Sequence, residues 1–187
     1  MKHMIIGITG TDGAGKGIVV DYLVKEKGFV HFSSREQITK EIEIRNLVAS
    51  RDILRLVGNE MRKNDGNDVL IARAIGQIYE QSIQNAAIES VRAVAEAETL
   101  KKAGGILLAV DADQKLRYER IVARASLTDQ ISFEKFTEQE AIEMNDLDPN
   151  GMQKAKVMEM ADYTIMNNGS PEEVYGQVDA VLEQLSK

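Results

Sequence analysis

Residues 10–17 of the chain are Gly10-Thr11-Asp12-Gly13-Ala14-Gly15-Lys16-Gly17, and they match the pattern G-x-x-x-x-G-K of a phosphate-binding loop. A short apolar stretch at 4–9 comes before them, and 16–27 places its apolar residues at helical spacing. The loop therefore joins a predicted strand to a predicted helix. Glycines let successive backbone N–H groups point inward at phosphate oxygens, and the helix N-terminus adds donors and a positive dipole end. The pattern predicts a site for a nucleoside triphosphate, which we take to be ATP.

Each residue of the loop has an expected part in this site. The Lys16 ammonium supplies a point charge for the β- and γ-phosphates. The serine or threonine that usually follows this lysine and helps to hold Mg²⁺ is missing, because Gly17 and Ile18 carry no hydroxyl. We therefore expect Mg²⁺ to be held by phosphates, water and a carboxylate elsewhere. The residues expected to contact ATP here are Thr11, Asp12, Gly13, Ala14, Gly15, Lys16, Gly17 and Ile18.

The composition is that of an ordinary globular protein. The chain has 187 residues, 43% of them hydrophobic and 28% charged, which suits a single domain, 1–187, with one sizeable core. The net charge of −7 argues against general nucleic-acid binding, and the lack of an apolar run of 18 residues argues against a membrane span. With no cysteine and no secretory signal, we expect a cytoplasmic protein.

Short apolar runs alternate with longer amphipathic stretches along the chain. This alternation predicts an α/β fold in which helices cover both faces of a parallel sheet. Ligands bind such sheets at the carboxyl ends of the strands, which are here Gly10, Ser33, Glu89, Asp111 and Asn167. The predicted strands are 4–9, 29–32, 84–88, 106–110 and 163–166. The predicted helices are 16–27, 34–82 with a break at 65–68, 92–103, 113–125, 126–160 with a break at 145–151, and a last one capped by Ser170.

The loop resembles that of the nucleoside monophosphate kinases, in which glycine also follows the lysine. In adenylate kinase and its relatives threonine comes next, where this chain has Ile18. Residues 12–16 also resemble thymidylate kinase, whose acidic loop residue contacts the acceptor sugar, so the resemblance implies that role for Asp12. It further implies the three-layer α/β/α fold of P-loop NTPases, with a five-stranded parallel sheet and a small helical lid.

The middle and the end of the chain resemble dephospho-CoA kinase and an uncharacterised group of kinase-like proteins close to it. The matching segments are 87–92, 110–124 and 161–170. They correspond to an acidic strand end followed by an arginine, to an arginine-bearing helix before the lid, and to a final strand with the loop near the adenine. The resemblance therefore implies that Asn167 contacts the adenine end of ATP.

Two helical regions are interpreted as parts of a kinase that surround its substrates. We expect the helices at about 34–82 to bind the acceptor. The polar, interrupted stretch at about 125–152 is interpreted as a lid that closes over ATP and excludes water, which a kinase needs to limit hydrolysis. A surface helical excursion is the alternative for this stretch.

Three arginines recur on one predicted helix. Arg117, Arg120 and Arg124 stand at i, i+3 and i+7, so a helix places them on one face. Spacing alone favours a solvated basic face paired with nearby acidic residues. Together with the loop and the resemblance, it favours guanidinium groups that stabilise the transferring phosphoryl group, more for Arg120 and Arg124 than for Arg117. The expected catalytic residues are Lys16, Arg120 and Arg124, and Arg120 is also expected to contact ATP.

The acceptor is predicted to meet several arginines and one carboxylate. In monophosphate kinases an arginine near the second strand grips the acceptor phosphate, which implies that role for Arg35; Arg62 and Arg92 are similar candidates by resemblance. An exposed helical arginine is the alternative for each. Glu89 ends a strand predicted to lie beside the first one, where a carboxylate can hold Mg²⁺ through water or orient the acceptor hydroxyl. A capping or salt-bridging role is its alternative, and Asp111 is a rival for the same work.

These features predict an ATP-dependent kinase with Mg²⁺ as its metal. Its acceptor would be a small nucleotide-like molecule such as a (deoxy)nucleoside monophosphate or dephospho-CoA. A nucleotide-dependent switch or ATPase is one alternative, although the chain has no Asn-Lys-x-Asp guanine motif after its last strand. A degenerate protein that binds ATP without catalysis is another, which Gly17 and Ile18 keep open.

Overall fold

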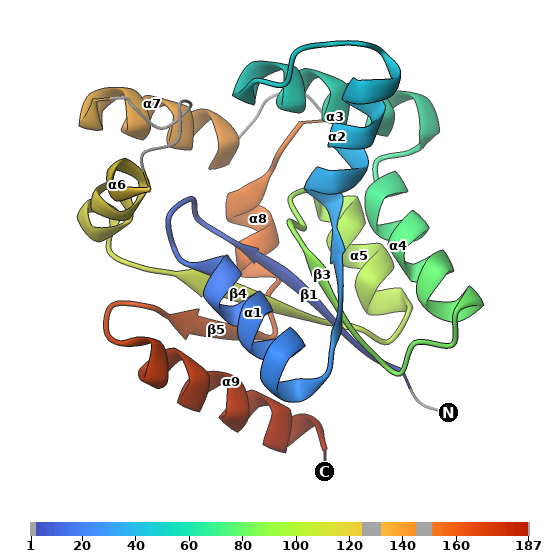
Figure 1. The fold of residues 1–187 in the computed structure, drawn as a ribbon, viewed down its shortest axis with the longest axis vertical. Helices are drawn as coiled ribbons and strands as arrows, with labels where there is room; N and C mark the ends of the chain where they lie inside the picture. Colours follow the sequence, from blue (N-terminus) through green and yellow to red (C-terminus); the bar gives the residue numbers. More distant parts are fainter. Residues whose placement is uncertain (1–2, 125–131, 145–150, 187) are drawn as a thin grey trace.

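The computed structural model describes residues 3–124, 132–144 and 151–186. Its centre is a sheet of parallel strands in the order β2-β3-β1-β4-β5, with helices on both faces (Figure 1). The strands are β1 (Met4–Gly10), β2 (Val30–Ser33), β3 (Asn85–Glu89), β4 (Ile106–Asp111) and β5 (Tyr163–Met166). Each predicted strand is confirmed to within one residue at either end, and so is the three-layer α/β/α arrangement.

The helices that pack on the sheet follow from its pleat, because successive side chains of β1 point to opposite faces. Ile6 and Ile8 face the layer formed by α1 (Lys16–Lys27) and α9 (Pro171–Leu185). Ile5 faces the layer formed by α4 (Val69–Glu80), α5 (Val94–Lys102) and α8 (Lys154–Glu159). Both faces of β1 are thus buried, which is why the strand reads as a continuous apolar run.

The region at 34–82 consists of three helices rather than the two that a single break would give. They are α2 (Ser34–Ile44), α3 (Arg51–Asp65) and α4. The break at 65–68 is confirmed, but the sequence prediction missed the interruption at 45–50. Asn46 adopts a left-handed φ of 54° there, and the Ser50 hydroxyl accepts a hydrogen bond from the Ile53 N–H to cap α3. Neither glycine nor proline marks this turn, which is why the sequence prediction missed it.

The remaining helices are α6 (Gln114–Ala123) and α7 (Phe133–Met144). Of the lid predicted at about 125–152, residues 125–131 and 145–150 lie outside the described residues, as does part of the helix predicted at 126–160. Asp113 stands at the N-cap position of α6, but its side chain makes no hydrogen bond to the first turn of that helix. It accepts one instead from Asn168 Nδ2, at 3.3 Å. Among the helices described, none is long and apolar enough to cross a membrane.

A buried ion pair fixes the turn that follows β3. Glu96, in the first turn of α5, accepts hydrogen bonds at 3.0 Å from both Nε and Nη2 of Arg62. Its second oxygen accepts from the backbone N–H groups of Arg92 and Ala93 at 2.8 and 3.0 Å. The side chains of Arg62 and Glu96 are only 3% and 1% exposed. This pair therefore joins α3 to the 90–93 turn, which leads to the carboxyl end of the sheet.

We predict that Arg62→Met lowers the free energy of unfolding by about 3–5 kcal/mol, because it leaves the Glu96 carboxylate buried without its cation. Arg73→Met is the matched control. It removes the cation of the Arg73–Asp65 pair, whose side chains are both 48% exposed, and is expected to cost about 0–1 kcal/mol. Urea unfolding followed by circular dichroism measures both. Equal losses for the two variants would contradict a special role for the buried pair.

Candidate phosphate-binding site

The loop between β1 and α1 is shaped by glycines in left-handed conformations. Gly10, Gly13 and Gly15 have φ angles of 135°, 79° and 91°. A Cβ at Gly13 would come within 2.5 Å of the Arg117 carbonyl oxygen, and one at Gly15 within 2.2 Å of Asn167 Nδ2. The loop therefore presses closely on α6 and on the end of β5, and only glycine fits at these positions.

The Lys16 side chain curls back over this loop. Its ammonium donates to the carbonyl oxygens of Gly10, at 3.1 Å, and Thr11, at 2.8 Å. Burial lowers the pKa of Lys16 to about 8, and the nearby Asp12 carboxylate opposes that shift. Both partners are neutral carbonyl oxygens, so the Lys16 ammonium can exchange them for the charged oxygens of a phosphate, with which it forms stronger hydrogen bonds.

Four further charged groups act electrostatically on Lys16 and therefore gather around it. They come from four parts of the chain and are Asp12, Lys154, Arg92 and Glu89. The cations lower the pKa of Lys16 further, and the carboxylates raise it. Three of the four were predicted as site residues. Lys154 was not, because a single lysine at the start of a short helix carries no motif, and its pairing with the loop depends on the fold.

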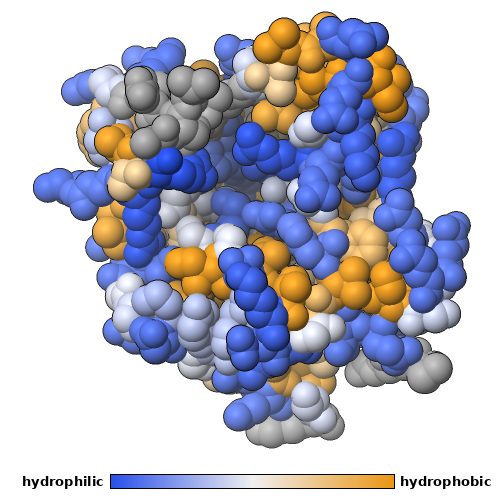
Figure 2. Space-filling view, in the orientation of Figure 1, coloured by the Kyte–Doolittle hydropathy of each residue, from blue (hydrophilic) through white to orange (hydrophobic). Residues whose placement is uncertain are grey.

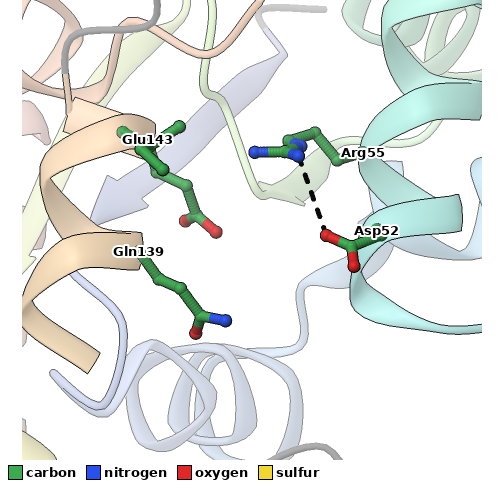
Figure 3. Close-up of a pocket in the computed structure, with 5 residues that line it drawn as sticks. Asp52, Arg55, Gln139 and Glu143 are labelled. Carbon is green, nitrogen blue, oxygen red and sulfur yellow. Dashed lines mark ion pairs between the residues drawn. The ribbon is translucent and has the colours of Figure 1, made fainter. Parts of the chain in front are cut away.

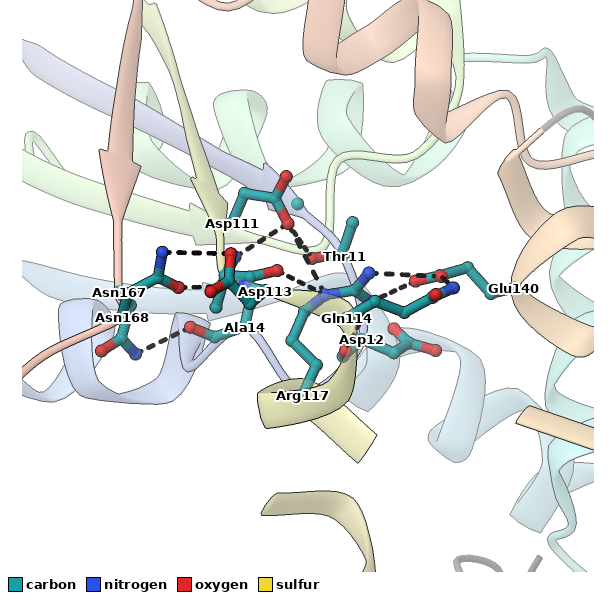
Figure 4. Close-up of polar contacts among 12 residues, drawn as sticks. Thr11, Asp12, Ala14, Asp111, Asp113, Gln114, Arg117, Glu140, Asn167 and Asn168 are labelled. Atoms are coloured by element: carbon teal, nitrogen blue, oxygen red, sulfur yellow. Dashed lines mark hydrogen bonds and ion pairs between the residues drawn. The ribbon is translucent and has the colours of Figure 1, made fainter. Parts of the chain in front are cut away.

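Asp12 connects the loop to α8 through Lys154 and to α6 through Arg117, and Figure 4 shows the second of these contacts. Lys154 Nζ lies 3.0 Å from Asp12 Oδ1 and also pairs with Glu143 of α7. Arg117 Nη1 donates to the Asp12 carbonyl oxygen at 3.2 Å and also pairs with Glu140 of α7. Asp12 is therefore linked to α7 twice, through Lys154 to Glu143 and through Arg117 to Glu140. These two glutamates lie one helical turn apart.

Arg117 is buried and holds the loop in place. Besides its contacts with Asp12 and Glu140, its Nε donates to the Ala112 carbonyl oxygen at 2.8 Å and lies 3.7 Å from Asp111 Oδ1. The side chain is only 6% exposed. Arg117 therefore supports the loop through buried contacts.

The ends of β4 and β5 fix the other side of the loop. The Thr11 hydroxyl donates to Asp111 Oδ1 at 2.6 Å, and Asn167 Nδ2 donates to the Ala14 carbonyl oxygen at 2.8 Å. Arg120 donates in turn to the Asn167 carbonyl oxygen at 2.9 Å. The Thr11 bond engages Asp111 with the loop, which favours Glu89 over Asp111 as the carboxylate that faces a ligand.

Glu89 stands at the end of β3, directly beside β1, with Ile8 as its partner in register. Its carboxylate lies 3.3 Å from His31 Nε2. The hydrogen bond to His31 holds the pKa of Glu89 below its usual value, with smaller contributions from Lys16 and Arg92. Ser90 follows with a left-handed φ of 74°, an unusual conformation for a residue with a side chain. Glu89 is thus kept ionised and half-buried near Lys16.

The carboxylate at Glu89 suits Mg²⁺, which prefers oxygen ligands and often keeps several waters. Within the described residues, no group of three or more His, Cys, Asp or Glu side chains could hold a metal ion. A Mg²⁺ ion at this site would therefore depend on oxygens from a bound triphosphate as well as on Glu89.

The predicted arginines differ in how exposed they are and in whether they lie near Lys16. Arg92 lies near Lys16, and its Nη1 donates to the Met152 sulfur at 3.4 Å. Arg35 is exposed in the first turn of α2, and Arg124 is exposed at the end of α6. Arg62 is different, because its burial against Glu96 leaves it no surface with which to touch an acceptor. The structure therefore corrects the expectation of direct acceptor contact for Arg62.

A small pocket lies between α3 and α7. Asp52 and Arg55 of α3 face Gln139, Ile142 and Glu143 of α7 across it (Figure 3). Figure 2 shows a hollow on this side of the molecule, bordered largely by hydrophilic residues. Glu143 lines this pocket and pairs with Lys154, which pairs in turn with Asp12, so two side chains connect the pocket to the phosphate loop.

The strand order, the glycine loop after β1 and the lysine at the start of α1 together define a P-loop fold of the nucleotide kinase type. The chain belongs to the AAA_18 family, described as an AAA domain, whose model matches residues 6–147, and to the UPF0200 family. The UPF0200 protein of Staphylothermus marinus is 30% identical over 99% of this chain and 94% of its own length. The UPF0200/UPF0201 protein of Archaeoglobus fulgidus is 29% identical over all of this chain, which spans 57% of that relative.

Solved structures share this fold at low sequence identity. TT1252 from Thermus thermophilus superposes with a TM-score of 0.64 and 19% identity, covering 99% of both chains. The shikimate kinase of Bacteroides thetaiotaomicron gives a TM-score of 0.61 at 14% identity, covering 98% of this chain and 99% of its own. At these identities the likeness shows the fold, and the P-loop kinase resemblance expected from the sequence is confirmed at that level.

We predict that Gly15→Ala destabilises the protein by about 1–3 kcal/mol and weakens ATP binding, because its Cβ meets Asn167 and its φ of 91° strains any other residue. Gly17→Ala is the matched control, since a Cβ at Gly17 meets nothing within 4 Å and the residue is helical. Denaturant unfolding and ATP calorimetry measure both variants. A Gly15→Ala protein with unchanged stability would contradict the close approach of Asn167.

We predict that ATP affinity is constant up to about pH 8 and then falls by about tenfold per pH unit. The pKa of Lys16 is lowered to about 8 in the free protein, and bound phosphate would raise it, so binding above pH 8 must take up a proton. Titrations between pH 7.5 and 9.5 measure this slope. In Lys16→Arg, whose guanidinium stays charged, the slope should vanish. An equal slope in the variant would assign the titration to another group.

Proposed function

We propose that this chain is an ATP-dependent phosphotransferase that moves the γ-phosphoryl group of ATP to a small, nucleotide-like acceptor. A (deoxy)nucleoside monophosphate and dephospho-CoA are the acceptors that the sequence resemblance favours. The observation that carries the proposal is the glycine loop at the carboxyl end of β1, where the Lys16 ammonium donates to loop carbonyls and Lys154 pairs with Asp12. A loop that only closed a turn would need none of these charged groups.

On the ATP side, the loop amides and Lys16 would bind the phosphates, and Asn167 and Arg120 would line the nucleotide end of the site. Arg120 and Arg124 come from α6, whose buried residue Arg117 fixes the helix against the loop. Their guanidinium groups would neutralise charge on the transferring phosphoryl group. Mg²⁺, when bound, would add positive charge at the phosphates, and Glu89 would hold it.

On the acceptor side, Asp12, Arg35 and Arg92 are the residues proposed to contact the substrate. Glu89 would orient the acceptor hydroxyl if it is not engaged with Mg²⁺. Asp52 and Arg55 of α3 stand across the pocket from α7, which supports α3 as part of the acceptor-binding region proposed at 34–82, and 125–152 is proposed as the lid. Little covalent chemistry is asked of the protein, because positioning and charge stabilisation supply most of the catalysis.

A second candidate function is nucleotide binding without phosphoryl transfer to an acceptor, as in an ATPase, a switch or a catalytically degenerate protein. One observation favours it. Gly17 and Ile18 place no hydroxyl at the position where P-loop proteins usually hold Mg²⁺, and the space beside Gly17 is open. A loop of this kind could bind triphosphate and still position the metal poorly.

We predict acceptor-stimulated ADP release from ATP and Mg²⁺ by the full chain. A coupled assay across nucleoside monophosphates, deoxynucleoside monophosphates and dephospho-CoA measures it, and Lys16→Met should lower the stimulated rate by about a hundredfold or more by removing charge stabilisation of the transition state. ATP hydrolysis that no acceptor stimulates would favour the ATPase. Tight ATP binding without any turnover would favour the degenerate binder and sink the kinase.

A further inference from the structure

The Asp12 carboxylate places a negative charge inside a loop that is proposed to bind a polyphosphate. Asp12 is close enough to Lys16 to oppose the lowering of its pKa. The same closeness makes the carboxylate repel any anion that Lys16 attracts, because a fixed charge acts on both. The chain as a whole is also acidic, with a net charge of −7, so it gives no general attraction to offset this repulsion. A loop of this composition needs a compensating cation.

Lys154 lies where such a cation is needed. Its Nζ is 3.0 Å from Asp12 Oδ1, and the lysine side chain is only 4% exposed. The two residues are 142 positions apart, and Lys154 comes to the loop from the first residue of α8. Burying an ammonium is costly unless it is paired with a carboxylate, so this placement is specific.

Glu143 shares the same ammonium. It reaches Lys154 from α7 and is itself only 7% exposed. One buried cation therefore stands between two carboxylates, one in the loop and one on the helix above it. Lys154 and Asp12 also act on Lys16 with opposite signs, so the two charges offset one another where phosphates would bind.

We propose that Lys154 is a positioning residue of the phosphate site, which neutralises and holds the Asp12 carboxylate so that the loop can accept a polyphosphate. Glu143 draws on the same positive charge and thereby weakens the attraction for the ligand. The inference rests on the proposed function only in that the loop binds ATP, and it requires neither turnover nor an acceptor.

A series of variants that each remove a charge from the full chain tests this role, with ATP affinity measured by calorimetry. Lys154→Met removes the positive charge that lies 3.0 Å from Asp12 Oδ1 and should weaken ATP binding by about tenfold. Asp12→Asn should tighten it by a similar factor, because it removes one of the two negative charges that share the Lys154 ammonium. The double variant returns the summed charge of positions 12, 143 and 154 to its wild-type value and should bind ATP within about threefold of the wild type. A bridge with a merely structural role would not show this rescue, because the double variant lacks the bridge as well.

A Lys154→Met protein that binds ATP as well as the wild type would overturn the proposal, and so would a double variant as weak as Lys154→Met. If Lys154→Met does not fold, Glu143→Gln decides the matter, because it leaves Lys154 and Asp12 in place. It should tighten ATP binding by about two- to fivefold. Unchanged or weaker binding would overturn the proposal.

The proposed function and this inference fail in different ways. If the wild-type chain binds ATP and inorganic tripolyphosphate no more tightly than Lys16→Met does, both are overturned. Binding that depends on Lys16 but is indifferent to the charges at 12, 143 and 154 would leave the phosphate site standing and overturn only the role of Lys154.

Discussion

The turn from β1 into α1 must reverse direction within a few residues while its N–H groups point inward, and this constraint orders the structure around it. Gly10, Gly13 and Gly15 meet it with left-handed φ angles. Because these residues have no side chains, β4, α6 and the end of β5 approach until Val110, Arg117 and Asn167 touch the loop. The contacts of Asp111, Arg120 and Asn167 follow from that closeness, so the site forms as a consequence of how the loop is packed.

An acidic chain can build an anion site only by concentrating its cations and shielding them from its own carboxylates. Here the cations are held in place by buried or half-buried partners, as in the pairs that join Arg117 to Glu140 and Lys154 to Glu143. The lowered pKa of Lys16 reflects the free-energy cost of burying an ammonium group near the other cations Lys154 and Arg92. A ligand with several negative charges would relieve that cost, which is the physical reason to connect this arrangement with a triphosphate and with phosphoryl transfer.

The sequence predicted what is encoded locally and missed what depends on contacts between distant segments. The glycine loop, the apolar strands and the Ser170 cap each follow from a few adjacent residues. The break at Asn46 lacks a glycine or proline, and the buried pair of Arg62 with Glu96 joins residues 34 positions apart. The pairing of Asp12 with Lys154 spans 142 positions, so neither the burial of Arg62 nor the presence of Lys154 in the site could be foreseen.

The central claim is that the backbone of residues 13–18 binds the phosphates of ATP, with Lys16 over them and the neighbouring strand ends in support. The chain is small enough, at 20.7 kDa, for its backbone amides to be followed individually in solution by ¹⁵N–¹H nuclear magnetic resonance. A titration with ATP should give its largest shifts at the amides of 13–18, with smaller ones at Asn167 and Arg120. Shifts concentrated elsewhere on the protein, with the loop unmoved, would contradict the account.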